Sequence, residues 1–335
     1  MVRKTAFAAA LALAGCREQA VPPAAPQPLP APAAPQSAPL RSAADCVAPF
    51  DAPLAREKLR ERKGEIRIGA LAGLKDAEDD NVAYLKKLLA ELKKRGAEVL
   101  VADGDLGDNP DEQETLLGAL AESGLPVIAG AGNREVRGEL DAAEEELRKK
   151  GAHITDLSHT RVVELGDATL VGLPGAFERR QLHSEGACIY VSKDIDALFG
   201  ELPRLPSPTV LVAAVPPRGQ DKNALDFSEG QNVGDPRLVP LLGRAPFGIF
   251  GQVWESGGRA VDLRGKPVPQ RTDVDQLYLN PGAADHTPWP MADGSVSNGQ
   301  AALLTIRGRK ASWEKVVPEE PAPPAMGGAR RAEHQ

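Results

Sequence analysis

The chain has 335 residues, a net charge of −7 with neutral histidines, and only 4% aromatic residues. An acidic chain is poorly matched to the phosphate backbone of nucleic acids, so we expect no nucleic-acid partner. Beyond the N-terminal region, no stretch is long and apolar enough to span a bilayer.

The N-terminus has the layout of an export signal that ends in a lipidation site. A basic pair at residues 3–4 precedes an apolar run at 5–14, which is about half as long as a membrane-spanning helix. The run ends in Leu-Ala-Gly-Cys, which resembles a bacterial lipobox. We therefore expect a signal peptide over residues 1–15 and a lipid on Cys16 that anchors the chain to the membrane. The alternative is an ordinary signal peptide that contains a chance cysteine.

Two low-complexity stretches enclose the rest of the chain. Residues 16–45 are dominated by alanine and proline, which predicts an extended tether. Residues 318–335 predict a disordered tail, and one large domain lies between the two, at 46–317. Arg17 stands where some bacterial lipoproteins carry the aspartate that retains them in the inner membrane. Its presence favours an outer-membrane destination within the cell envelope.

The first half of the domain alternates short apolar runs with amphipathic segments. Apolar residues recur at helical spacing over 82–92 and over 111–123, which predicts two helices. Apolar runs around them predict strands at 66–71, 98–102 and 126–129. This alternation is typical of parallel βαβ units.

Strands predominate after residue 150. Residues 161–165 and 168–172 flank a Gly-Asp turn and predict an antiparallel pair. Further apolar runs predict strands at 209–213, 247–250, 276–279, 301–306 and 311–316. The combination of parallel and antiparallel strands predicts mixed sheets in a layered α/β sandwich.

The loops that follow these strands are the candidate site, because ligands of α/β folds gather there. Gly-Asp-Leu-Gly-Asp at 104–108 and Gly-Asn-Arg-Glu at 132–135 follow the second and third strands. A proline pair at 216–217 and Gly-Gln-Val-Trp-Glu at 251–255 follow later ones. Each of these motifs is commonplace alone, so only their order along the chain is informative about the site.

The series resembles the loop motifs of the calcineurin-like metallophosphoesterases. Those motifs are Asp-x-His, Gly-Asp-x-x-Asp, Gly-Asn-His-Glu, a histidine before a proline pair, and Gly-His-x-His. The resemblance covers about residues 65–317 and implies a four-layer α/β/β/α sandwich with mixed sheets. It places Asp105 at the metal-bridging carboxylate, Asn133 at a metal-binding asparagine and Gln252 at a histidine ligand.

The chain departs from this family at most of its ligand positions. The substituted positions are Gly73 for the aspartate and Lys75 for the histidine of the first motif, Arg134 for the catalytic histidine, and Ala214 and Trp254 for two further histidines. Of the retained oxygen donors, only Asp105 is charged, and no imidazole remains. Because Zn, Mn and Fe favour nitrogen donors, we expect no cofactor, or at most one weakly bound Mg or Ca ion.

The substitutions also add positive charge. A buried carboxylate needs a cationic partner, so we expect Lys75 to pair with Asp105, and Trp254 to fill the volume of the missing imidazole and metal. Lys75 and Arg134 then become candidates for binding an anion. The alternative is that these substitutions arose by neutral drift and that the side chains of Lys75 and Arg134 point into solvent. None of the five histidines occupies a motif position, and we expect each to be a surface or packed residue.

Cys46 and Cys188 are the remaining cysteines once Cys16 is lipidated. Outside the cytoplasm they could form a disulfide or persist as two separate thiols, and the sequence favours neither.

Three functions are compatible with these features. The first is a non-catalytic envelope module that binds an anionic ligand or an envelope protein. The second is a residual phosphoester hydrolase with one Mg or Ca ion at Asp105, Asn133 and Gln252. The third is a structural lipoprotein whose pocket is idle.

Overall fold

The computed structural model describes residues 46–206 and 208–318. The predicted signal peptide, the lipidation site at Cys16, the tether, and the tail after residue 318 lie outside the described residues. No helix in the described part of the chain combines the length and the apolar character that a bilayer crossing requires.

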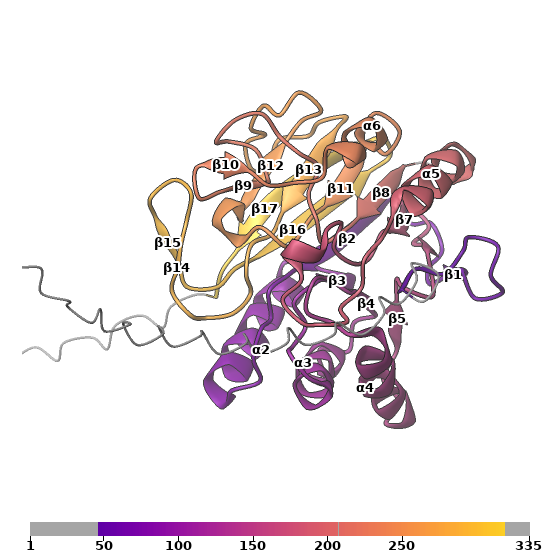
Figure 1. Ribbon diagram of the computed structural model, residues 1–335, viewed down its shortest axis with the longest axis vertical. Helices are drawn as coiled ribbons and strands as arrows, with labels where there is room; N and C mark the ends of the chain where they lie inside the picture. The colour runs from indigo at the N-terminus through magenta and orange to yellow at the C-terminus, as the bar shows by residue number, and fades with distance from the viewer. Residues whose placement is uncertain (1–45, 207, 319–335) are drawn as a thin grey trace, which may run out of the picture. The chain divides into compact units, whose positions relative to one another are not determined.

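Two mixed sheets form the centre of the domain (Figure 1). The first has six strands in the order β17-β16-β2-β3-β4-β5, with β2 to β5 parallel and β16 and β17 antiparallel to their neighbours. Its strands are β2 (Glu65–Leu71), β3 (Val99–Asp103), β4 (Val127–Gly130), β5 (Ile154–Asp156), β16 (Ala301–Arg307) and β17 (Lys310–Val316).

The second sheet has seven strands in the order β1-β6-β7-β8-β11-β13-β12. They are β1 (Arg56–Lys58), β6 (Val162–Glu164), β7 (Thr169–Gly172), β8 (Thr209–Val212), β11 (Phe247–Ile249), β12 (Arg259–Val261) and β13 (Leu277–Asn280). The pair β6 and β7 is antiparallel, as the sequence predicted, whereas β7, β8, β11 and β13 run parallel.

Helices cover the outer face of each sheet, which gives four layers. The helices α2 (Asp79–Lys94), α3 (Pro110–Glu122) and α4 (Arg137–Lys149) lie beside the first sheet, and α5 (Ser192–Glu201) and α6 (Val239–Leu242) beside the second (Figure 1). The remaining short strands are β9 (Phe227–Ser228), β10 (Gln231–Asn232), β14 (Trp289–Pro290) and β15 (Val296–Ser297). The predicted four-layer α/β/β/α sandwich is therefore confirmed.

Alternation of side chains along each strand builds a separate apolar core at each layer boundary. In β3, Val99 and Val101 face the core between the sheets, whereas Leu100 and Ala102 face the core under the helices. In β8, Val210 and Leu211 divide in the same way between the central core and the core under α5 and α6. Period-two alternation thus buries both faces of each strand.

The sequence did not predict α4, α5 or the short strands β1, β5 and β12. Helix α4 has only three buried apolar residues, Leu140, Ala143 and Leu147, in a segment that is otherwise rich in charge. These three strands have three residues each, and the unpredicted strands β9, β10, β14 and β15 have two each, too few for alternation to be recognised.

The two sheets meet closely where β11 ends beside β3. A Cβ atom at Gly251 would lie 2.1 Å from the carbonyl oxygen of Asp103 and 2.6 Å from the Cβ atom of Ala72. The backbone of one sheet therefore contacts the backbone of the other with no room for a side chain.

We predict that Gly251→Ala lowers the free energy of unfolding by about 2–3 kcal/mol, because the added methyl group must push two backbone segments apart. The matched control is Gly200→Ala in α5, where no atom lies within 4 Å of the added carbon. That change should be neutral or should stabilise by up to about 1 kcal/mol. Urea denaturation measures both, and equal effects would contradict this account of the junction.

Candidate functional site

The loops singled out in the sequence converge at one edge of the sandwich, after the ends of parallel strands from both sheets. Backbone hydrogen bonds join them: Gly73 N donates to Gly104 O at 3.1 Å, and Gly104 N donates to Gly130 O at 2.8 Å. From the second sheet, the amides of Gly251 and Gln252 both donate to Ala214 O, at 3.1 and 2.8 Å. The loops that carry the motifs therefore lie together in space.

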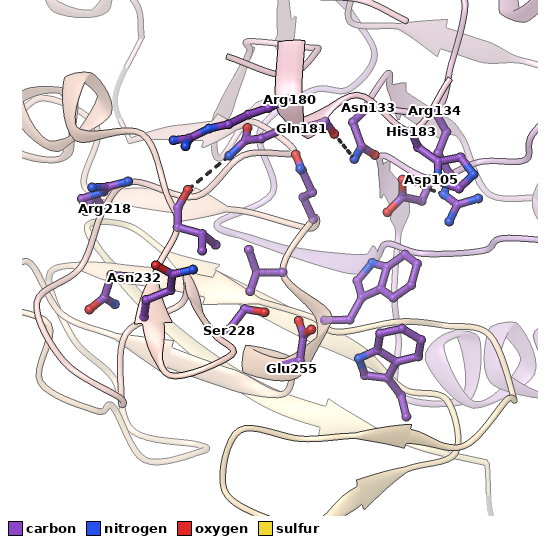
Figure 2. A pocket seen from close by; sticks show the side chains of 16 residues that line it. Asp105, Asn133, Arg134, Arg180, Gln181, His183, Arg218, Ser228, Asn232 and Glu255 are labelled. Atoms are coloured by element: carbon purple, nitrogen blue, oxygen red, sulfur yellow. Dashed lines mark hydrogen bonds and ion pairs between the residues drawn. The ribbon is translucent and has the colours of Figure 1, made fainter. Parts of the chain in front are cut away.

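The cluster lines a pocket of about 610 Å³. Among its walls are Asp105, Asn133, Arg134, Gln252 and Trp254, five of the residues predicted from the motifs (Figure 2). Gly73, Lys75 and Ala214 do not line it. Sequence reasoning did not single out the other lining residues. Val253 and Glu255 belong to the motif at 251–255, and the rest come from loops and short strands outside the motifs: Arg180, Gln181, His183, Arg218, Ser228, Gln231, Asn232, Val233 and Trp289.

Arg134, and not Lys75, is the cationic partner of Asp105. Arg134 Nε lies 3.3 Å from Asp105 Oδ1, and its guanidinium also forms an ion pair with Asp108. The Arg134 side chain is 16% exposed and that of Asp105 only 4%, so this pair is screened little by water. The prediction that Lys75 would pair with Asp105 is wrong, because the cation beside Asp105 is Arg134.

Lys75 is instead held between two indole rings. Its Nζ atom lies 4.5 Å from the ring centroids of both Trp254 and Trp289, and 3.4 Å from Asp285 Oδ2. The Lys75 side chain is 14% exposed, and that of Asp285 is 1% exposed. Cation–π contact and a buried counter-ion account for the ammonium, so the structure gives Lys75 a packing role and not the expected role in anion binding.

Trp254 packs closely against Gly73. A Cβ atom at Gly73 would lie 2.9 Å from Trp254 Nε1 and 3.1 Å from the backbone of Ala283, and Gly73 has a φ of +58°. A side chain at this position would therefore require the indole or the backbone of Ala283 to shift. That Trp254 fills the volume of a missing imidazole and metal stays a prediction.

Strained backbone marks the same site. Four non-glycine residues in the described part of the chain have positive φ, and two of them are Lys75 at 61° and Asp105 at 57°. The Lys75 amide donates to Asp105 O at 3.0 Å, so the two strained turns support each other. Such conformations persist only when the surrounding structure enforces them, and they cluster at functional sites.

Three buried acids lie beneath the pocket. Burial, followed by the neighbouring charge of Glu135, raises the pKa of Asp105 to about 7, and Arg134 opposes this rise. Burial and the charges of Asp105 and Glu135 raise the pKa of Asp103 well above its usual value. Burial also raises the pKa of Glu135, although its carboxylate accepts from the amides of Leu106 and Gly132 at 2.5 and 2.6 Å. At neutral pH, therefore, the three carboxyl groups are not all ionised.

The donor set does not fit a dinuclear metal centre. Three oxygens could face an ion, from Asp105, Asn133 and Gln252, and the Gln252 Oε1 atom is buried with no hydrogen-bond partner in the described part of the chain. The one carboxylate among them already contacts the Arg134 guanidinium. His183 reaches the pocket wall but is half exposed and lies 3.7 Å from Asp108. A cation would have to displace a guanidinium and would gain no nitrogen ligand from the motif positions.

A second group of potential metal ligands lies away from the pocket, at Asp141, Asp156 and His159. His159 Nε2 lies 2.8 Å from Asp141 Oδ1, and its Nδ1 atom lies 2.9 Å from Arg137 Nη2. Because a guanidinium only donates, Nδ1 accepts there, and the remaining proton of a neutral ring lies on Nε2, facing Asp141. The geometry is that of a hydrogen-bonded charge network between α4 and the loop after β5.

No family model and no curated protein matches the sequence. Solved structures do match the fold. One aligns with a TM-score of 0.57 at 15% identity, covering 75% of this chain and 99% of its own. The protein TT1561 of Thermus thermophilus aligns with a TM-score of 0.51 at 15% identity, covering 74% of this chain and 97% of its own. A dimetal phosphatase from Danio rerio aligns at 11% identity with a TM-score of 0.47, covering 76% and 99%.

At this identity the likeness concerns the fold alone. The chain has the fold of the calcineurin-like metallophosphoesterases, as the motif series predicted, and its sequence differs from the motifs of that family at most ligand positions. What those ligand positions do in this chain follows from their own geometry.

We predict that Asp105→Asn stabilises the protein, and does so more above pH 7 than below pH 5. The folded pKa of about 7 exceeds the usual 3.8, so the charged carboxylate opposes folding increasingly as pH rises from about 4 to 7 and fully above that. Removal of the charge should add about 2–4 kcal/mol at pH 8 and little at pH 4. Urea denaturation at the two pH values measures the difference. A variant that is destabilised equally at both would refute this.

Proposed function

We propose that the chain is a non-catalytic binding module, anchored to the bacterial cell envelope through Cys16, that holds a small anionic ligand in the pocket beside Asp105. The observation that carries the proposal is the contact of Arg134 with Asp105. It places a fixed guanidinium where the family has its catalytic histidine, beside the carboxylate that bridges the metals there.

The charges at the pocket mouth favour an anion. Arg180 and Arg218 add two exposed guanidinium groups to Arg134, whereas Asp105 and Glu255 are the acidic residues of the wall. Asp105 carries only part of a charge near neutral pH, because its pKa is about 7. The wall residues alone therefore have a positive balance, while Asp108 and Glu178, just outside the wall, pair with Arg134 and Arg180. Arginine is well suited to recognise phosphate or carboxylate oxygens.

The wall also carries neutral hydrogen-bonding groups for the rest of a ligand. The amide of Asn133 donates to Gln181 O at 2.6 Å, which leaves its carbonyl oxygen for other partners. Gln231 and Asn232 from β10 line the pocket, and Asn232 lies on the side of Arg218 (Figure 2). A volume of about 610 Å³ is in the range of small-molecule sites, which suits a phosphorylated or carboxylated metabolite.

The same wall lacks what phosphoester hydrolysis requires. Metal-dependent hydrolysis needs a cation to activate water and to neutralise the developing charge. Arg134 can neutralise charge, but the one imidazole among the described wall residues, that of His183, is solvent-exposed and lies near Asp108. The proposed module therefore binds its ligand without converting it.

A residual hydrolase is the second candidate, and one observation favours it. The Oε1 atom of Gln252 is buried and has no hydrogen-bond partner among the described residues. With oxygens of Asp105 and Asn133, it gives three oxygen donors in one pocket wall. One Mg or Ca ion completed by water would suit such donors if Arg134 moved away.

We predict no metal-dependent phosphatase activity in the purified protein. The assay is hydrolysis of p-nitrophenyl phosphate with added Mn, Mg or Ca, together with elemental analysis of the protein as isolated. The non-catalytic proposal expects background rates and less than one equivalent of metal. One equivalent of tightly held metal, with turnover that a chelator and Asp105→Ala both abolish, would establish the residual hydrolase instead.

We predict that inorganic phosphate or pyrophosphate binds in the pocket and that Arg134→Gln weakens binding about 10- to 100-fold, since it removes a charge-assisted contact. Binding should also strengthen from pH 8 to pH 6, because protonation of Asp105 frees Arg134 for the anion. Isothermal titration calorimetry measures both effects. The control is Arg309→Gln, an exposed residue on the β16–β17 turn. Equal affinities in the two variants, or no binding at all, would favour a purely structural lipoprotein.

A further inference from the structure

The two cysteines of the described domain lie together although they are far apart in the sequence. Cys46 is 3% exposed and Cys188 is fully buried, and both belong to the apolar core under α5 and α6. The Cys188 thiol is in hydrogen-bond contact with Cys46. A disulfide between them would bring the two sulfur atoms to the S–S bonding distance of about 2.05 Å.

Each cysteine is positioned by contacts that do not involve the other. On the Cys46 side, Ala48 N donates to Ser158 O at 2.8 Å, and Arg161 Nη1 donates to Ala48 O at 2.7 Å. The Arg161 guanidinium also lies 4.4 Å from the ring centroid of Phe50. These contacts dock the start of the domain against the loop after β5.

On the Cys188 side, the backbone is fixed against the loop after β7. Ala176 N donates to Cys188 O at 2.9 Å, and Tyr190 N donates to Ala176 O at 3.0 Å. Gly175 packs so closely that a Cβ atom there would lie 2.8 Å from Cys188 O. In the folded domain, both cysteines are therefore held by contacts on their own sides of the pair.

We propose that Cys46 and Cys188 form a disulfide in the native, exported protein, which fastens the point where the predicted tether enters the domain. The step is a thiol–disulfide exchange with a disulfide-bearing oxidant. One thiolate attacks the oxidant and forms a mixed disulfide, and the second thiolate displaces the oxidant's sulfur. The oxidant is reduced to two thiols, and the two cysteine protons pass to solvent or to the leaving thiolates.

The burial of the pair determines when the bond forms. Contact with Cys46 and burial raise the pKa of the Cys188 thiol, so it has little thiolate character once the domain has folded. Neither sulfur is accessible to a large oxidant in the folded domain. Oxidation therefore occurs while residues 46–50 are still undocked, and the finished bond is shielded from reductants.

The test uses the full chain, expressed with its own N-terminus for export, and the same chain refolded in a glutathione redox buffer. Free thiols are alkylated in denaturant without reductant, and the digest is analysed by mass spectrometry. We expect a linked peptide pair that contains Cys46 and Cys188, and no alkylation at either. Alkylation of both cysteines after refolding, or a link from either to Cys16, would overturn the proposal. If the bond formed in the refolded sample but not in the sample expressed for export, the proposed pairing would hold and the prediction of export would be contradicted.

The effect of reductant on the thermal unfolding temperature is a second readout. Two thiols that only pack against each other would not make this temperature sensitive to reductant. Addition of reductant during unfolding should lower the transition temperature of the wild type by about 5–10 °C, because the bond closes a long loop. The double variant Cys46→Ala, Cys188→Ala should show no such shift. If that variant fails to fold, Cys46→Ser alone, at the edge of the domain, serves in its place. A wild type that is insensitive to reductant would refute the bond.

Discussion

The site depends on how one buried carboxylate is neutralised. Asp105 sits in a strained turn beneath the pocket, with Asp103 and Glu135 behind it, and burial alone would make its charge unfavourable. Arg134 supplies the compensating charge from the neighbouring loop, and the partial protonation of the acids supplies the rest. A metallophosphoesterase solves the same electrostatic problem with divalent ions. In this chain the guanidinium of Arg134, a covalently attached cation, lies beside the carboxylate of Asp105.

The second cationic substitution acts differently. Lys75 does not share the charge of Asp105 but joins Trp254, Trp289 and Asp285 in a separate packed unit beside the pocket. Two of these four residues lie on the segment 285–289, which enters β14 and is far along the chain from the first motif. The two cationic side chains therefore lie in two adjacent clusters, and the cationic group of the Arg134 cluster is the one that lines the pocket.

The sequence predicted much of this arrangement, for reasons that can be named. Alternation along β3 and β8 and helical spacing along α2 and α3 are strong local patterns, and they predicted both sheets. The motif series predicted which loops meet, since strand ends on one edge must lie together. The partner of Asp105 could not be predicted, because Lys75 and Arg134 are equally plausible by position and only side-chain geometry separates them. Asp285 and Trp289, which decide that choice, lie in the segment between β13 and β14 and at the start of β14, and they carry no motif signal.

The contact between Trp254 and Gly73 ties together substitutions at three positions. Because the indole lies beside a glycine with little room for a side chain, an aspartate introduced at position 73 alone would meet the Trp254 ring and the backbone of Ala283. A histidine introduced at position 254 alone would leave Lys75 without one face of its aromatic sandwich. Residues 73, 75 and 254 are therefore interdependent, and a change at any one of them alters the surroundings of the other two.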